Sequence, residues 1–193
     1  YSSESLDQGL GFPIVHDFAY AKTATPVFVM LPLDVISRDG QLQHVQALDV
    51  SLQTLKKIGV EGVMIDVWWG IVEREGPETY DWKAYVELLR MVKKADLKLN
   101  AVMSFHACGA NVGDYFRVTL PKWVLEAADK DPDLFFTDQY GYRNPECISL
   151  WADNPKTLAG RTPLESYRDF MQSFRDEIEA RGLMDVVEEI SVG

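Results

Sequence analysis

Polar side chains occur at the points where three apolar runs of the sequence end. Asp66 breaks the run that begins at residue 62, His106 follows the run 99–105, and Asp34 follows the run 26–31. In parallel α/β proteins the carboxyl ends of the strands carry the active-site residues. We therefore expect Asp66 and His106 to contact a ligand. A loop ion pair for the aspartate and a satisfied core position for the histidine are the competing interpretations.

The residues that follow these two side chains are of types that bind sugars. Trp68 and Trp69 come shortly after the aspartate, and an indole ring offers a flat apolar face with one polar edge. The segment 108–114 reads CGANVGD, and its glycines would allow it to close over a ligand as a lid that carries Asp114. Core packing for the tryptophans and an ordinary turn for the loop are equally open at this point.

The sequence contains no pattern typical of a metal site or of an activated nucleophile. His16, His44 and His106 are dispersed, and CxxC, HExxH and EF-hand spacings are absent. The GxSxG and GxxxxGK motifs are absent as well. Two cysteines, Cys108 and Cys147, cannot build a disulfide scaffold, so a reducing compartment is the default. We predict no metal site.

The charge balance excludes two classes of partner. The chain of 193 residues has 19 Lys and Arg against 30 Asp and Glu, a formal net charge of −11. Nucleic acids and anionic membrane surfaces require clustered basic residues, so neither is an expected partner. The apolar runs are far shorter than the roughly 18 residues of a membrane helix. A hydrophobic share of 47% and a charged share of 25% are ordinary for a folded globular protein.

The chain must position these groups with alternating strands and helices. Continuous apolar runs predict strands, the first of them buried on both faces, and three- and four-residue spacing predicts helices. Asp81 is expected to cap the second long helix; Thr162 and Glu165 have capping-box spacing before the last one, which Gly182 ends. The predicted strands are 26–31, 62–67, 99–105 and 186–192, and the predicted helices are 45–55, 85–92, 123–128 and 163–181.

Alternation of this kind predicts an α/β fold with a parallel sheet. A doubly wound open sheet and a (β/α)8 TIM barrel are both compatible with it, although the first strand–helix connection lacks a glycine-rich phosphate-binding fingerprint. A barrel needs about 250 residues, so on that interpretation the chain covers about the first four βα units and is incomplete. Residues 1–25 show no clear period and are expected to form an arm or linker, with the barrel portion at 26–193.

Several motifs together resemble plant-type β-amylase, glycoside hydrolase family 14. The resemblance covers nearly everything from residue 26 to 193, in the family's order and spacing. It implies a (β/α)8 barrel that hydrolyses α-1,4-glucans such as starch to maltose with inversion and without a cofactor. The motifs are GVMIDVWWG (62–70), YDW (80–82), MSFH (103–106), NVGD (111–114), LPKWV (120–124), TD (137–138), RN (143–144) and GRTP (160–163).

The resemblance also assigns roles. In the family the catalytic acid is a Glu in a GELRYP block directly after the fourth strand, and the base is a second Glu much further on. Both would lie beyond Gly193, so no catalytic residue is expected in this chain and its status as an enzyme stays open. Asp66, His106 and Asp114 would be the substrate-binding residues, the last on the mobile lid.

Two departures from the family leave alternatives open. Ala110 and Trp151 stand where the family usually has glycine. The chain could be the N-terminal part of an active β-amylase, a non-catalytic glucan-binding or regulatory relative, or a structural subunit that needs a protein partner because a half-barrel exposes its edges.

The resemblance implies a location in the chloroplast, with the cytoplasm as the alternative. Oxidation of Cys108 could hinder lid closure, although a role as a small apolar residue in a turn fits it better.

Overall fold

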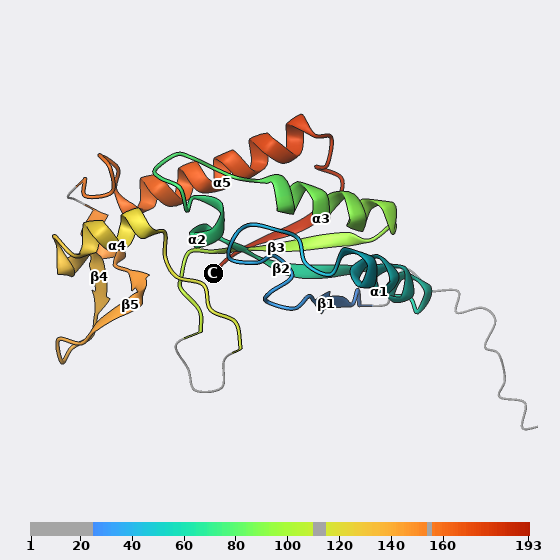
Figure 1. Ribbon diagram of the computed structural model, residues 1–193, viewed down its shortest axis with the longest axis horizontal. Coiled ribbons are helices and arrows are strands. Elements are labelled where there is room, and N and C mark those ends of the chain that lie inside the picture. The colour runs from blue at the N-terminus through green and yellow to red at the C-terminus, as the bar shows by residue number, and fades with distance from the viewer. Residues whose placement is uncertain (1–24, 110–114, 154–155) are drawn as a thin grey trace, which may run out of the picture.

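A four-stranded parallel sheet forms the centre of the molecule, as the alternation predicted. The structure, a computed structural model, describes residues 25–109, 115–153 and 156–193 (Figure 1). The sheet has the strand order β1-β2-β3-β6. Its strands are β1 (Phe28–Met30), β2 (Gly62–Trp68), β3 (Lys98–Ser104) and β6 (Val187–Val192). All but one residue of the expected arm 1–25 lie outside the described residues.

The register of the sheet brings the ends of β2 and β3 to the same level. Asp66 pairs with Val102, and Trp68 pairs with Ser104. Because side chains alternate along a strand, Asp66 and Trp68 share one face of the sheet with their partners on β3. This register places the predicted Asp66 site at the carboxyl edge.

Three long helices connect the strands and bury the opposite face. They are α1 (Val45–Lys57), α3 (Lys83–Lys94) and α5 (Pro163–Ala180), and α3 and α5 lie side by side over the sheet (Figure 1). The β2 and β3 side chains that face the helices are almost fully buried. They are Val63, Ile65, Val67, Leu99, Ala101 and Met103. The apolar stripes predicted from the sequence therefore form one core between helices and sheet.

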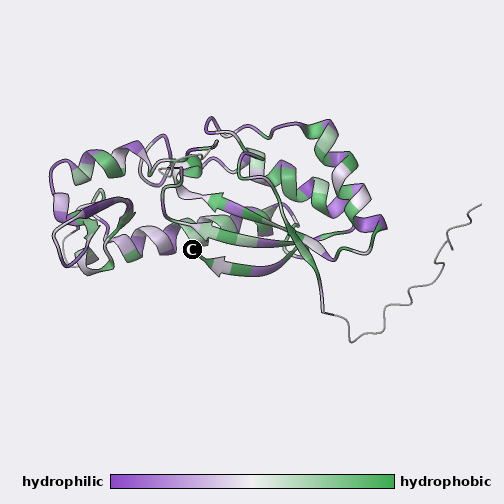
Figure 2. Ribbon diagram, turned by 90° about the horizontal axis from the view of Figure 1, so that it is seen from below, coloured by the Kyte–Doolittle hydropathy of each residue, from purple (hydrophilic) through white to green (hydrophobic). Residues whose placement is uncertain are grey.

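The prediction that the first strand is buried on both faces is wrong. Met30 of β1 is 44% exposed, and Val192 of β6, at the other edge, is 70% exposed. Both strands are edges of the described sheet, and no helix covers the face seen from below in Figure 2. An apolar run indicates that a strand can be buried, but other segments must supply the layer that covers it.

The predicted capping residues lie at the starts of both helices, although the one at α3 is shifted by one position. The capping box of α5 is present, with Thr162 and Glu165 bonded reciprocally and Pro163 in the first position. Trp82 rather than Asp81 occupies the cap position of α3, but Asp81 Oδ1 accepts from the amide of Lys83, the first residue of the helix, at 3.2 Å, so the predicted capping contact is present one residue earlier than expected. The Trp82 indole is buried and donates to Ser173 of α5 at 2.8 Å, so packing sets where α3 begins.

The stretch between β3 and α5 is a small lobe rather than an irregular loop. It contains the expected helix α4 (Lys122–Ala128) and an antiparallel hairpin, β4 (Phe135–Thr137) with β5 (Arg143–Ile148), which the sequence analysis missed. Two short 3-10 helices, η1 (Pro132–Leu134) and η2 (Leu150–Asp153), flank the hairpin. A further helical turn, α2 (Trp69–Val72), follows β2 directly. The small lobe lies beyond the carboxyl ends of the strands (Figure 1).

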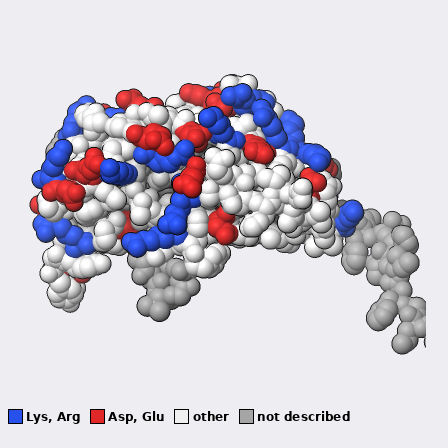
Figure 3. Space-filling model, in the orientation of Figure 1, with Lys and Arg blue, Asp and Glu red and all other residues white. Residues whose placement is uncertain are grey.

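The surface of the helical side mixes both signs of charge. On the face shown in Figure 3, Lys and Arg alternate with Asp and Glu, and no basic patch gathers there. Within the described residues, no helix is long and apolar enough to cross a membrane.

Candidate functional site

Asp66 lies at the carboxyl end of β2, and a neighbouring hydroxyl holds its carboxylate. Ser104 Oγ on β3 donates to Asp66 Oδ1 at 2.6 Å, and Ser104 is fully buried. The second oxygen, Oδ2, has no hydrogen-bond partner within the described part of the chain. Asp66 itself is only partly buried. One carboxylate oxygen is therefore fixed and the other is available to a ligand.

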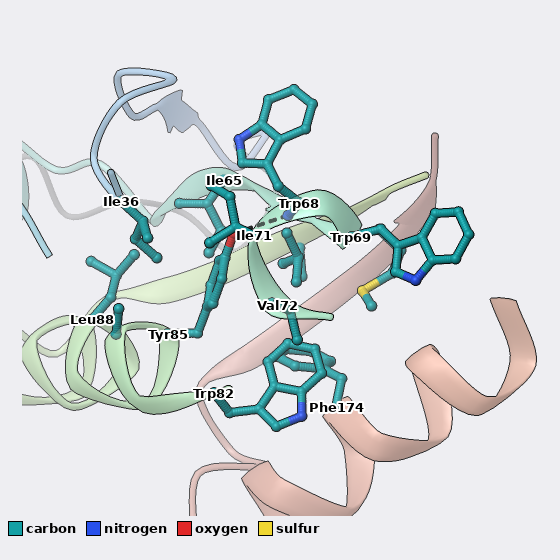
Figure 4. Close-up of a cluster of buried hydrophobic side chains, with 14 of the residues drawn as sticks. Ile36, Ile65, Trp68, Trp69, Ile71, Val72, Trp82, Tyr85, Leu88 and Phe174 are labelled. Atoms are coloured by element: carbon teal, nitrogen blue, oxygen red, sulfur yellow. Dashed lines mark hydrogen bonds between the residues drawn. The ribbon is translucent and has the colours of Figure 1, made fainter. Parts of the chain in front are cut away.

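A buried tyrosine holds the backbone of the same strand end. The Tyr85 hydroxyl, from α3, donates to the carbonyl oxygen of Asp66 at 3.2 Å and accepts from the amide of Trp68 at 2.9 Å (Figure 4). Burial raises the pKa of Tyr85, so the hydroxyl stays protonated and keeps donating. At this point β2 gives way to α2, and the tyrosine satisfies two backbone groups there.

His106 joins Asp66 at the same edge through Trp68. The His106 and Trp68 rings meet edge to face, with their centroids 5.5 Å apart. The histidine also lines an open cavity of about 450 Å³, together with Phe105, Tyr167 and Gly193. The structure thus places two of the three predicted substrate-binding residues at the same edge of the sheet. Asp114, the third, lies outside the described residues, as does Ala110.

The two tryptophans serve packing rather than presenting a stacking surface. Trp68 and Trp69 are both buried, and Trp68 points away from Tyr85 and the helical core (Figure 4). Trp69 meets Trp123 and Tyr167 edge to face at 5.8 and 5.5 Å between ring centroids. Aromatic contacts of this geometry stabilise a core and leave no ring face open to a sugar.

A hydrogen bond ties the small lobe to the site. The amide of Ala107, next to His106, donates to the carbonyl oxygen of Glu146 on β5 at 2.7 Å. One residue further, Cys108 pairs with Val118 through two backbone hydrogen bonds of 2.8 and 2.9 Å. Burial, with help from Glu146, raises the pKa of the neighbouring Cys147 thiol. The segment that follows His106 is therefore anchored at its base on both sides.

A buried ion pair, also missed by the sequence analysis, joins α2 to the segment before α5. Glu73 is fully buried, and Arg161 Nη2 donates to its Oε1 at 2.8 Å. The Trp69 indole and the amide of Glu78 donate to the same carboxylate. The Arg161 guanidinium also lies over the Trp123 ring, 5.5 Å from its centroid. No local sequence pattern predicts this ion pair, because its partners are 88 residues apart in the chain.

Sequence comparison identifies related proteins. The profile of glycosyl hydrolase family 14 matches residues 28–193. Beta-amylase 1, chloroplastic, of Arabidopsis thaliana is 55% identical over 168 residues, which are 87% of this chain and 29% of that protein. The protein of the same name from Oryza sativa subsp. japonica is 53% identical over 89% of this chain and 32% of its own length. The chain spans about a third of the length of these curated relatives.

Structural comparison gives the same answer. The catalytic domain of beta-amylase from Paenibacillus polymyxa matches with a TM-score of 0.69 and 31% identity, over 86% of this chain and 36% of that one. A beta-galactosidase from Marinomonas ef1 matches with a TM-score of 0.53 at 15% identity, which shows a shared fold alone. With its profile match, its relatives and its parallel sheet in agreement, the chain belongs to glycosyl hydrolase family 14.

Proposed function

We propose that this chain forms the N-terminal portion of a (β/α)8 barrel, and that the complete gene product releases maltose from the non-reducing ends of α-1,4-glucans with inversion. The observation that carries the proposal is Asp66 at the carboxyl edge of the sheet, with one oxygen held by Ser104 and the other open. Membership of family 14 and the beta-amylase names of the relatives support it.

The chain's own residues would bind the sugar at the cleaved bond. Asp66 Oδ2 accepts a hydrogen bond from a sugar hydroxyl, and a charged acceptor makes such a bond about twice as strong as a neutral one. A fixed negative charge also stabilises the oxocarbenium-like transition state of glycoside hydrolysis. His106 would present its ring from the segment that follows β3, and Asp114 would contact the sugar from the lid.

The catalytic pair is proposed to follow Gly193. Inversion requires two carboxyl groups about 6.5–9.5 Å apart, one protonating the leaving oxygen and one activating water. Glu73 is unsuited to either role, because it is fully buried and both of its oxygens accept hydrogen bonds from Trp69, Glu78 and Arg161. In this proposal the chain supplies the supporting wall of the site, and later strands supply the acid and the base.

The proposed substrate is starch or maltodextrin, and the proposed location is the chloroplast. Curated relatives with 52–55% identity are named chloroplastic beta-amylases, which supports that location over the cytoplasm. No cofactor enters the proposed reaction, since acid–base chemistry by two carboxyl groups is sufficient for it.

A second proposal is a non-catalytic glucan-binding protein. Trp151 favours it, since the family resemblance places glycine there and the Trp151 side chain is 92% exposed. An exposed indole offers binding area without adding to the core.

Maltose release by the complete gene product separates the two proposals. Soluble starch is incubated with the protein, and proton NMR follows the anomeric signals of the first product. β-Maltose as the initial product supports the hydrolytic proposal. Retention in an amylopectin gel without maltose release supports the binding proposal instead. A protein that is not retained and releases no maltose would contradict both proposals.

A further inference from the structure

Ser104 stands directly behind Asp66 and has one hydrogen to donate. Two acceptors lie within reach, Asp66 Oδ1 at 2.6 Å and the carbonyl oxygen of Val102 at 3.2 Å. The carboxylate is nearer and charged, so it takes the hydrogen. Because Ser104 is fully buried, water does not compete for this bond from its side.

We propose that Ser104 is a positioning residue that sets the plane of the Asp66 carboxylate and so presents Oδ2 to a single sugar hydroxyl. The inference deepens the proposed function and rests on it for the role of Asp66. Nothing in the family resemblance assigns a role to this serine.

Free rotation of the carboxylate is the problem that Ser104 solves. The last torsion of an aspartate side chain is broad, so a carboxylate without a fixed partner samples many orientations. The Tyr85 hydroxyl holds only the Asp66 backbone, through the carbonyl oxygen at 3.2 Å. Ser104 alone, among the described residues, holds the carboxylate itself. The strand register fixes Ser104 opposite Trp68, so the donor cannot drift.

The arrangement also predicts how the sugar is held. An aspartate with two unoccupied oxygens can grip two neighbouring sugar hydroxyls, one on each oxygen. Here Ser104 occupies Oδ1 from the buried side, so the geometry favours one hydroxyl on Oδ2. Loss of the serine hydroxyl frees the carboxylate to rotate, and small misplacement of such a group is costly for binding and rate.

The test measures maltotriose affinity of the complete gene product by calorimetry for Ser104→Ala. We expect affinity to fall about tenfold, the usual effect of losing one charge-assisted hydrogen bond. Ser104→Cys, which keeps a weak donor of similar shape, should recover part of the loss. Ser166→Ala is the matched control, because Ser166 is equally buried and its Oγ has no hydrogen-bond partner within the described residues. This control should bind as the wild type does.

The outcomes separate this inference from the proposed function. Wild-type affinity and kcat/KM in a folded Ser104→Ala protein would overturn the positioning role and leave the hydrolytic proposal intact. A wild type that binds maltotriose without hydrolysing it contradicts the hydrolytic proposal, while the affinity ratio still decides the role of Ser104. A wild type that neither binds nor hydrolyses overturns both. An equal loss in Ser166→Ala would assign the effect to packing and also count against Ser104.

Discussion

Two carboxylates on one short segment, Asp66 and Glu73, have opposite surroundings. Glu73 follows α2 directly and is fully buried, and its two oxygens accept from the Trp69 indole, the Glu78 amide and the Arg161 guanidinium. Asp66, seven residues earlier, is partly exposed and accepts one hydrogen bond from the described residues.

The difference separates a structural carboxylate from one that can bind a ligand. A buried charge is tolerated only when donors satisfy it completely, and such a group has nothing left to offer. An incompletely satisfied carboxylate at an open sheet edge keeps an acceptor for substrate. The number of hydrogen-bond donors around each carboxylate, rather than the residue type, distinguishes the two.

Glu73→Gln should give the largest effect on stability. It leaves the buried Arg161 guanidinium with one remaining carboxylate, Asp169, at the longer distance of 3.5 Å, and breaking a buried pair costs about 3–5 kcal/mol of unfolding free energy. Urea unfolding of the complete gene product measures the change. The control is Glu126→Gln, which removes the exposed pair with Lys122, whose side chains are 58% and 85% exposed. There we expect about 0.5 kcal/mol or less. Equal losses in the two variants would contradict the distinction.

Asp66→Asn should have the opposite pattern of effects, with little change in stability and a large loss of ligand affinity. The amide keeps an oxygen that can accept from Ser104, so the urea midpoint should hardly move. Maltotriose affinity should fall by about 1.5–3 kcal/mol, or roughly 10- to 150-fold, because a charged acceptor is lost. Calorimetry measures the affinity. A variant that unfolds easily and still binds would place Asp66 with Glu73 as a structural residue.

Arg161→Lys tests how much the planar guanidinium adds to the buried pair. Lysine keeps the charge near Glu73 but loses the fork that also reaches Tyr80 and lies over Trp123. We expect a loss of about 1 kcal/mol in unfolding free energy. Tyr80 offers a second measurement, because burial and the Glu73 charge raise its pKa to about 12 while Arg161 opposes them. If an ultraviolet titration finds the same Tyr80 pKa in Arg161→Lys as in the wild type, the coupling between Arg161 and Tyr80 is contradicted.

Glu165 provides a third carboxylate, partly exposed, for which we expect the smallest effect on stability. The Thr162 amide donates to it in the α5 capping box and lowers its pKa below the ordinary value of 4.5. A lowered folded-state pKa stabilises the protein above pH 4.5, and this contribution disappears as the pH falls through the lowered value. The stability difference between wild type and Glu165→Ala should therefore shrink in acid. A difference that grows on acidification would refute the assignment.

The parallel sheet, the α5 cap and the placement of Asp66 and His106 could be predicted from the sequence. The first two follow from local sequence patterns, and the third follows because active-site residues of parallel α/β proteins lie at the carboxyl ends of strands. The sequence analysis missed the β4–β5 hairpin, whose strands are short and only partly buried, so no clear apolar alternation marks them. It missed the Glu73–Arg161 pair and the Ser104 contact because both are set by tertiary placement. Tyr85 begins the predicted helix 85–92, but the two hydrogen bonds of its hydroxyl depend on α3 docking against β2.

The small lobe between β3 and α5 has a consequence for the order in which the sheet assembles. Residues 69–97 separate β2 from β3, whereas residues 105–186 separate β3 from β6. Loop-closure entropy adds about 0.6 kcal/mol for each doubling of length, so closing the longer connection costs about 1 kcal/mol more. The longer connection should therefore close more slowly. Folding should therefore pair β2 with β3 first and add β6 late. A lobe that folds early, tied by the Ala107–Glu146 bond, would shorten this closure and speed the last pairing.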